Sequence, residues 1–443
     1  MKGLRSTIVF VVVAAALAAY IFGYLNKRPA DEGTKKAKVF ADLKADTIDE
    51  LLVKTGGEST TLKKVDGVWR IVAPIESKAD DSEVSAMTTN LATIEVDRLV
   101  DEKASDLKDY GLAEPVVDVA FKAAGDKDYR HLLLGDKSPT GATLFAKRGA
   151  DGRVFVVTQF QETTFRHGTF DLRDKTVMAF DRDKLDAIDV QVDGKPVVFA
   201  KSGTEWRIAK PVAASADFAA VEGLIGKLQT LQMKSIETEH PSAADLKTFG
   251  LEKPAVTVTL GMGSAKATLV IGSRAGDTAM FARDLSKPAV ITVETSAVDD
   301  LRKGADEYRR KDIFEFRAYN ATAIEIVRDG KTFAFEKVKG QGANAEETWK
   351  RTQPSAADPK KDDMDSLLTR LANLRASSFA DEKTKTGLEK PTATVTVKFG
   401  EGNKAEKVTF GKVGDDVFAS RAGEPGAAKV DNVDFEQALK ALD

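Results

Sequence analysis

The stretch VWRIVAP at residues 68–74 decides the fold, because the chain repeats it twice more. EWRIAKP at 205–211 and TWKRTQP at 348–354 carry a tryptophan and a proline at the same offset. The tryptophans lie 137 and 143 residues apart, a period of domain size and far longer than a solenoid or propeller unit. The sequence therefore predicts tandem copies of one domain, marked by Trp69, Trp206, Trp349, Pro74, Pro211 and Pro354.

Further elements recur with the same period. YGLAEP, FGLEKP and TGLEKP share a glycine and a proline, at Gly111, Gly250, Gly387, Pro115, Pro254 and Pro391. LLLGDK, LVIGSR and VTFGKV each contain a glycine that we expect to end a strand, at Gly135, Gly272 and Gly411. A phenylalanine eight residues before an isoleucine opens each copy, as Phe40 and Ile48, Phe180 and Ile188, and Phe316 and Ile324. These landmarks predict repeat domains at 39–176 (copy 1), 177–312 (copy 2) and 313–443 (copy 3).

Each copy is predicted to be an α+β domain, mainly antiparallel sheet with one or two covering helices. Asp193-Gly194 and Asp329-Gly330 separate runs of β-formers, which is a strong hairpin signal. Copy 1 has Gly56-Gly57 at that place and Asp66-Gly67 at the next turn. We expect a three-stranded meander that ends in the tryptophan strand. A second β region follows the Gly-Leu-x-x-Pro element, where apolar residues alternate strictly, as at Val117, Val119 and Phe121.

One amphipathic helix should follow the tryptophan strand in each copy. Asp80, Asp217 and Asp358 are placed as N-caps, since a carboxylate accepts hydrogen bonds from the first free amides. Apolar residues then recur at helical spacing, for example Val84, Met87 and Leu91. Gly111 and its equivalents are expected to close a short helical turn.

An uncharged segment, TIVFVVVAAALAAYIFGYL at 7–25, is long enough to span a membrane. We expect a membrane anchor at 1–25 and a charged tether at 26–38. The alternative is a cleaved secretory signal, since Lys2 and Arg5 precede the apolar run and its alanines offer cleavage sites. A single-pass inner-membrane protein with its body in the periplasm or extracytoplasmic space is expected. A cytosolic body on the same anchor is the alternative.

Charge and composition exclude several classes of function. Formal net charge is -3, and both signs are interspersed, which gives no basic stripe for nucleic acid. Because the chain has no cysteine, disulfides, thiolate nucleophiles and cysteine-ligated metals are excluded.

No catalytic, cofactor-binding or metal-binding residues are predicted. The tryptophans could stack a ligand, but one large aromatic per domain is more often core packing. His131, His167 and His240 lack the spacing of a metal site. Acidic clusters at Asp80-Asp81, Asp299-Asp300 and 358–365 lie at helix starts or on charged helical faces, which favours a structural role. The chain has no G-x-S-x-G motif and no P-loop.

Tandem W-x-[IVR]-x-x-P and [YFT]-G-L-x-x-P elements behind an N-terminal anchor resemble the bacterial domain-of-unknown-function family numbered forty-three forty. The resemblance covers residues 39–443, and copy 3 departs from it at Thr386, where the others have an aromatic. Genes of this family often lie beside those of ABC transporters of the gliding type. The resemblance therefore implies an accessory role in the cell envelope, and it supplies no catalytic residues.

These observations favour a non-enzymatic, membrane-anchored envelope protein whose repeated domains bind a partner such as an ABC transporter component. Linked weak modules gain avidity, which is a use for repetition. The alternative is an extracytoplasmic enzyme or a small-ligand or glycan-binding protein with its site at a domain junction. A spacer that supplies only length is a third reading.

Overall fold

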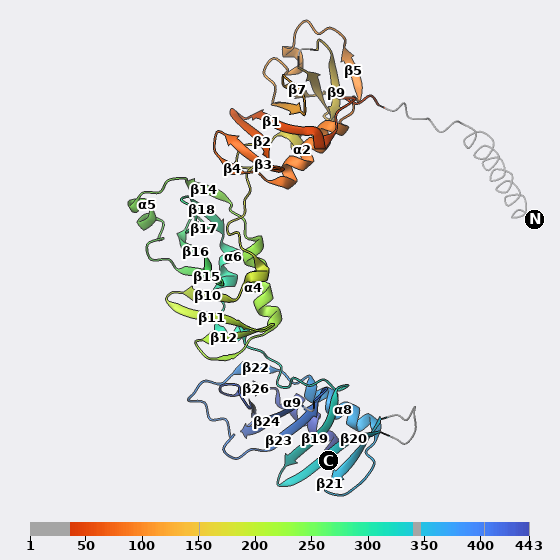
Figure 1. Ribbon diagram of the computed structural model, residues 1–443, viewed down its shortest axis with the longest axis vertical. Helices are drawn as coiled ribbons and strands as arrows, with labels where there is room; N and C mark the ends of the chain where they lie inside the picture. Colours follow the sequence, from red (N-terminus) through yellow and green to blue (C-terminus); the bar gives the residue numbers. More distant parts are fainter. Residues whose placement is uncertain (1–35, 150, 340–346, 403, 443) are drawn as a thin grey trace, which may run out of the picture. The chain divides into compact units, whose positions relative to one another are not determined.

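The computed structural model describes residues 36–149, 151–339, 347–402 and 404–442 (Figure 1). The chain divides into two compact units, Met1–Lys175 and Thr176–Asp443. The anchor expected at 1–25 and most of the tether lie outside the described residues. Among the residues that are described, no helix is both long and apolar enough to cross a membrane.

One sheet of nine antiparallel strands forms the framework of the first unit. Its order is β4-β3-β2-β1-β6-β7-β8-β9-β5, so the first meander joins the second through β1 and β6. The strands are β1 Ile48–Thr55, β2 Glu58–Val65, β3 Val68–Ala73, β4 Ser77–Lys78, β5 Arg98–Asp101, β6 Val117–Ala123, β7 Arg130–Lys137, β8 Thr143–Arg148 and β9 Val154–Thr158. The helices are α2 Asp81–Thr93 and α3 Phe160–Phe165.

Two sheets with the same strand order make up the second unit (Figure 1). Copy 2 contains β10 Ala187–Val192, β11 Lys195–Ser202, β12 Glu205–Lys210, β13 Ala214–Ser215, α4 Phe218–Thr230, β14 Ser235–Thr238, α5 Ala243–Thr248, β15 Val256–Met262, β16 Ala265–Arg274, β17 Ala279–Asp284, β18 Val290–Glu294, α6 Thr295–Leu301 and α7 Ala305–Tyr308. Copy 3 contains β19 Ala321–Arg328, β20 Lys331–Lys339, β21 Glu347–Gln353, α8 Lys361–Ala372, β22 Ala376–Phe379, β23 Ala393–Phe399, β24 Lys404–Val413, β25 Asp416–Arg421, β26 Ala428–Val430 and α9 Asn432–Leu439. In copy 3 an isolated β-bridge between Arg351 and Ala357 takes the place of the short edge strands β4 and β13 of the other copies.

The shared strand order shows that the chain is a tandem repeat of an α+β fold built mainly from antiparallel sheet. Local sequence sets the turns of the meander. Asp193 and Asp329 take left-handed φ values of 48° and 51°, and the glycine after each also has a positive φ. Two consecutive positive φ values define the tight turn that matches the twist of a hairpin. Asp66 and Gly67 form the same turn one hairpin later in copy 1.

The helix after the tryptophan strand crosses one face of each sheet, from the strand at one edge to the strand at the other. In copy 1, α2 connects β4 to β5, and Val84, Met87 and Leu91 bury their side chains completely in a core shared with Trp69. The equivalent residues of α4 and α8 are also buried. The periodicity therefore predicted the correct helix face in every copy.

The alignment of the opening phenylalanines is wrong by two residues in copies 2 and 3. The backbone amides of Val39, Val177 and Ile313 each bond to the carbonyl oxygen of a residue just beyond the helix, 25 positions after the tryptophan of their copy, which makes these three positions equivalent. The residue after each is Phe40, Met178 and Phe314, and all three are buried. The register of the meander makes Leu51, Ile188 and Ile324 equivalent, so Ile48 is not the counterpart of the other two isoleucines. Phe180 and Phe316 therefore match each other but not Phe40.

Two cap predictions for copy 3 are also wrong. Helix α8 begins at Lys361 with Lys360 as its N-cap, and Asp358 instead forms an ion pair with Lys350 at 3.8 Å. Asp358 follows the Arg351–Ala357 bridge directly, so it is still part of the edge segment. Gly111 and Gly250 do close short helical turns with φ of 64° and 72°. Gly387 has the same left-handed φ but follows an irregular segment with no described helix.

Candidate functional site at the junction of copies 2 and 3

The repeated tryptophans lie on the helix-covered face of each sheet. Trp69 and Trp206 are 6% and 3% exposed, which leaves no free indole face for a ligand. The Nε1 of Trp206 donates to the carboxylate of Glu222 on α4 at 3.3 Å. Trp349 is half-buried and packs at the margin of the core of copy 3. These positions are used for packing one helix onto one sheet.

The Gly-Leu-x-x-Pro element packs on the opposite face of the sheet, against the third repeated glycine. A Cβ on Gly135 would lie 2.2 Å from the Tyr110 carbonyl oxygen, and one on Gly411 would lie 2.4 Å from that of Thr386. These glycines lie within β7, β16 and β24, not at the strand ends as predicted. They are required because a loop backbone crosses the strand too closely for any side chain.

The marker prolines do not converge on a common site. Pro74, Pro211 and Pro354 each follow a cis peptide bond at the end of the tryptophan strand. Pro115, Pro254 and Pro391 each precede the first strand of the second β region. All of them therefore shape the fold of their own copy.

Two histidines have acidic partners that sequence spacing hides, one across adjacent strands and one between the segment after α3 and helix α2. His131 Nδ1 lies 2.8 Å from Asp118, its neighbour on the adjacent strand, and His167 lies 3.6 Å from Glu83. His240 is exposed. Within the described ranges no group of three or more His, Asp or Glu side chains could hold a metal ion.

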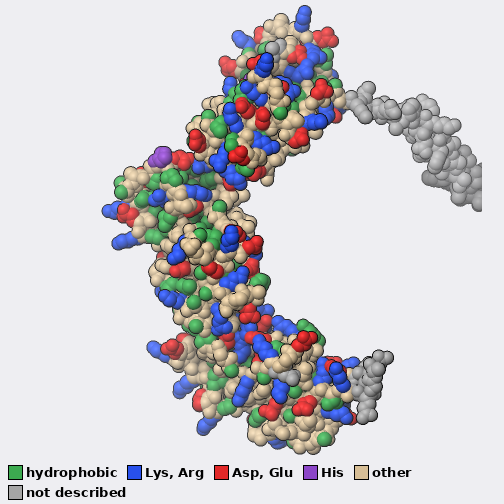
Figure 2. Space-filling view, in the orientation of Figure 1, with side chains coloured by type: hydrophobic (Ala, Val, Ile, Leu, Met, Phe, Trp, Pro, Cys, Tyr) green, Lys and Arg blue, Asp and Glu red, His purple; other side chains and the backbone are tan. Residues whose placement is uncertain are grey.

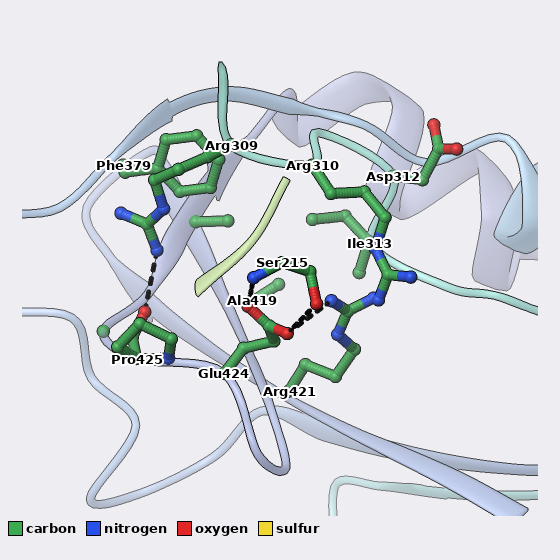
Figure 3. A pocket seen from close by; sticks show the side chains of 12 residues that line it. Ser215, Arg309, Arg310, Asp312, Ile313, Phe379, Ala419, Arg421, Glu424 and Pro425 are labelled. Atoms are coloured by element: carbon green, nitrogen blue, oxygen red, sulfur yellow. Dashed lines mark hydrogen bonds and ion pairs between the residues drawn. The ribbon is translucent and has the colours of Figure 1, made fainter. Parts of the chain in front are cut away.

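A cluster of charged residues lies where copies 2 and 3 meet, inside the second unit. A small cavity there is lined by residues of β13, of the segment after α7, of β22 and of the loop after β25 (Figure 3). The carboxylate of Glu424 accepts hydrogen bonds from the hydroxyl of Ser215 and, at 2.9 Å, from its amide. The Arg309 guanidinium donates to the Pro425 carbonyl oxygen at 2.8 Å and lies 3.7 Å from the centre of the Phe379 ring.

Arginine and glutamate side chains compensate one another around this cavity. Arg310 pairs with Glu315 at 2.7 Å, and Arg421 pairs with Glu424 at 3.4 Å. Burial alone would raise the pKa of Glu315, but its bonds to Lys404 and Arg310 lower that pKa to about 2. Burial opposes ionisation of Glu424 too, yet hydrogen bonds from Ser215 hold its pKa below the usual range.

This arrangement can hold two domains together, but it is poorly suited to acid or base catalysis. A general base near neutral pH needs a raised carboxyl pKa, whereas Glu315 and Glu424 have lowered ones. Ser215 bonds to a carboxylate that remains ionised, and no histidine lines the cavity in the described part of the chain. The acids and arginines are used in ion pairs.

An ion pair that sequence reasoning missed recurs in every copy, and its member in copy 3 lies at this junction. The strands β8, β17 and β25 align as LFAKR, MFARD and VFASR, at 144–148, 280–284 and 417–421. The last residue of each pairs with the residue three positions later, as Arg148 with Asp151, Asp284 with Lys287, and Arg421 with Glu424. In copy 2 the acidic residue comes first and the basic residue second. The Phe-Ala dipeptide shared by these three strands could have revealed from the sequence that they are equivalent.

Comparison with known proteins agrees with the repeat structure. The family described as Domain of unknown function (DUF4340) matches residues 69–205 and 206–391, two tandem segments that begin at Trp69 and Trp206. No curated protein matches the chain. A solved DNA polymerase sliding clamp from Pseudomonas aeruginosa has 9% identity over 88% of this chain and 92% of its own, with a TM-score of 0.16. That score is too low to relate the two folds. The chain belongs to the family described as Domain of unknown function (DUF4340).

Proposed function

We propose that this protein is a non-enzymatic, membrane-anchored scaffold of the cell envelope, whose tandem domains bind a protein partner. The observation that carries the proposal is that the recurring residues of all copies are used to build the fold. Trp69 and Trp206 are buried, and Gly135, Gly272 and Gly411 each receive a loop backbone. Repetition of a fold whose shared tryptophans and glycines serve packing suits a set of binding surfaces on one chain.

The surface supports protein binding better than nucleic-acid binding. Lys and Arg side chains are interspersed with Asp and Glu over the face seen in Figure 2. The formal net charge of -3 agrees with that distribution. A phosphate backbone would need a continuous basic stripe.

The anchor and the transporter link are parts of this proposal. The uncharged segment 7–25 would place the protein in the inner membrane with its body in the periplasm. The family resemblance suggests a partner in an ABC-type transport system of the gliding kind.

The first test is the location of the body. In intact spheroplasts we expect external protease to degrade the domains, and we expect the full chain to sediment with membranes. The matched control replaces two residues of the apolar segment, Ala15→Asp and Leu17→Lys, which should release the body from the membrane fraction. A body protected from protease until the cells are lysed would contradict the periplasmic placement.

The second test identifies the partner. The full chain, tagged at its C-terminus and crosslinked in native membranes, should recover components of an envelope transport system. The control is the same chain with the two anchor substitutions, which should lose them. Recovery of cytosolic proteins alone from the membrane-bound form would overturn the scaffold proposal.

The junction-site alternative would use the cavity in Figure 3. That alternative predicts a small molecule whose binding depends on Arg421 and Glu424. Thermal unfolding of the full chain against a panel of carboxylates, phosphates and oligosaccharides tests it. A ligand that stabilises the native chain but not Arg421→Met would favour the alternative over the scaffold.

A further inference from the structure

In copy 1 the segment 172–174, which follows the last helix, adds a strand to the edge of the sheet. The amide of Asp80 donates to the carbonyl oxygen of Leu172 at 2.9 Å. The amide of Asp174 donates to the carbonyl oxygen of Lys78, also at 2.9 Å. Such a pair of bonds is typical of an antiparallel ladder, so the outward-facing groups of this edge are satisfied.

Copy 2 builds the same arrangement with a different sequence. The amide of Asp217 donates to the carbonyl oxygen of Tyr308 at 2.7 Å. The amide of Arg310 donates to the carbonyl oxygen of Ser215 at 2.9 Å. The apolar residue that leads the added segment is buried in both copies, since Leu172 is 0% exposed and Tyr308 is 5% exposed. This edge therefore accepts an added strand that carries one large apolar side chain.

Copy 3 presents the same edge without an added strand in the described part of the chain. Asp358 and Lys360 hold the places of Ser215 and Asp217, since each pair follows the tryptophan of its copy at the same distance. No described residue bonds to the amide of Lys360 or to the carbonyl oxygen of Asp358. The ion pair between Asp358 and Lys350 uses the side chain and leaves this carbonyl oxygen available.

The face beneath this edge is also less covered than in the other copies. Trp349 and Phe333 pack at the margin of the core and are only partly buried. Ile71 and Ile208 are each 1% exposed, whereas strand register places the half-buried Arg351 at their position in copy 3. A large apolar side chain from an added strand would remove aromatic surface from water here.

The charge at this edge differs between the copies. Asp80 and Asp217 cap their helices, and Lys175, just after the added segment of copy 1, lies 4.0 Å from Asp80. Copy 3 has an exposed lysine, Lys360, at the place of these acids. A segment added to copy 3 should therefore carry an acidic residue where copy 1 carries Lys175, three positions after its apolar residue.

We propose that the edge of copy 3 binds an extended segment of a partner protein, which pairs antiparallel with residues 358–360. The segment presents one large apolar side chain to Trp349 and an acidic side chain to Lys360. In this mode of recognition main-chain hydrogen bonds supply affinity and side chains supply specificity. The inference rests on the proposed scaffold function and names one of its binding surfaces. A scaffold that binds only through other surfaces would still recover its partners from membranes but would not bind such a segment.

The probe is a fluorescein-labelled peptide, GADEYRRE, which copies residues 304–311 with Lys311→Glu. It should bind the full chain in detergent saturably, as measured by fluorescence anisotropy, and a peptide with aspartate in place of the tyrosine should not bind. Methylation of the peptide amide at the place of Arg310 removes the donor to Asp358 and should weaken binding about fivefold. Methylation at the place of Arg309, whose amide makes no described bond to the edge of copy 2, is the matched control and should change binding little.

The variant Lys360→Pro tests the second bond on the protein itself. Lys360 has a φ of −64°, which a proline ring adopts, and no described residue uses its amide, so the fold should be kept. Binding of the probe should fall about fivefold. Lys360→Ser keeps the amide and should lose only the ion pair, a change of about twofold.

Three results would each overturn the proposal: no saturable binding of the probe, equal binding of the two methylated peptides, or equal binding of the probe by Lys360→Pro and wild-type chains. If Lys360→Pro does not fold, the two methylated peptides decide on the wild-type chain.

Discussion

The Cβ position of Gly272 lies 2.1 Å from the carbonyl oxygen of Phe249, a distance that no side chain can tolerate. The same approach joins Gly135 to Tyr110 and Gly411 to Thr386. Two sequence markers that are about twenty residues apart thus describe one contact, in which a loop crosses a strand of the second β region. The contact explains why both glycines recur together.

Gly272→Ala should therefore lower the free energy of unfolding by about 2 to 3 kcal/mol, because the loop or the strand must shift. Urea unfolding of the full chain measures the loss. Gly223→Ala is the matched control: Gly223 lies inside α4, where no described heavy atom comes within 4 Å of its Cβ position. That variant should gain about 0.5 to 1 kcal/mol from helix propensity. Equal stabilities for the two variants would contradict the proposed contact.

Helix α8 is capped less well than its counterparts. Asp80 and Asp217 accept hydrogen bonds from amides of the first turn, whereas the side chain of Lys360 makes no capping bond to the described residues. Lys360→Ser should raise the free energy of unfolding by about 0.5 to 1 kcal/mol, and Asp217→Ala should lower it by about 1 kcal/mol. Thermal unfolding at low protein concentration measures both. A destabilised Lys360→Ser variant would show that α8 is fixed by other contacts.

Sequence periodicity was sufficient for the repeats, the hairpins and the helix faces, because each depends on local residue order. The turn at Asp193-Gly194 and the buried face of α2 needed no knowledge of distant residues. The predicted equivalence of residues was wrong where the copies differ by an insertion. Copy 1 has one more residue than the other copies between its start and Leu51, the counterpart of Ile188 and Ile324, and a fixed spacing cannot detect such an insertion.

Contacts between distant segments were beyond sequence reasoning for a different physical reason. His131 meets Asp118 only through the register of β6 and β7. Ser215 meets Glu424 only because two copies pack together, and these residues are 209 positions apart. Neither pair has a spacing that a local pattern could reveal. The candidate site at the junction therefore came from the structure alone.

Acid should weaken copy 3 through Glu315. Its pKa falls from the usual 4.5 to about 2 in the folded chain, so the folded state favours the ionised carboxylate. The resulting stabilisation is present above about pH 4.5 and disappears as the pH falls toward 2. At pH 7 Glu315→Gln should cost about 1 to 2 kcal/mol, a value reduced for solvent screening.

The measurement is denaturant unfolding of wild-type and Glu315→Gln chains between pH 7 and pH 2.5. Their stabilities should converge at the acid end. Glu401→Gln, an exposed glutamate in a turn of the same copy, serves as the control and should change little at any pH. A difference between the wild-type and Glu315→Gln chains that stayed constant down to pH 2.5 would exclude titration of Glu315 as its cause.

The Arg309 and Phe379 pair should couple copies 2 and 3 energetically. The guanidinium lies 3.7 Å from the ring centre, and the Arg309 residue is 8% exposed, so the pair is largely desolvated. Desolvated cation–π contacts are worth about 1 to 2 kcal/mol. A double-mutant cycle with Arg309→Met and Phe379→Leu should therefore give a coupling of that size in the unfolding free energy.

The control cycle combines Arg309→Met with Phe399→Leu, whose ring packs near Phe316 and Lys404 instead. That cycle should be additive within about 0.5 kcal/mol. If the first cycle were additive as well, Arg309 would contribute only its hydrogen bond to Pro425, and the two copies would be joined chiefly by Ser215 and Glu424. Their unfolding transitions would then separate in a Glu424→Ala chain, because that substitution removes both hydrogen bonds from Ser215.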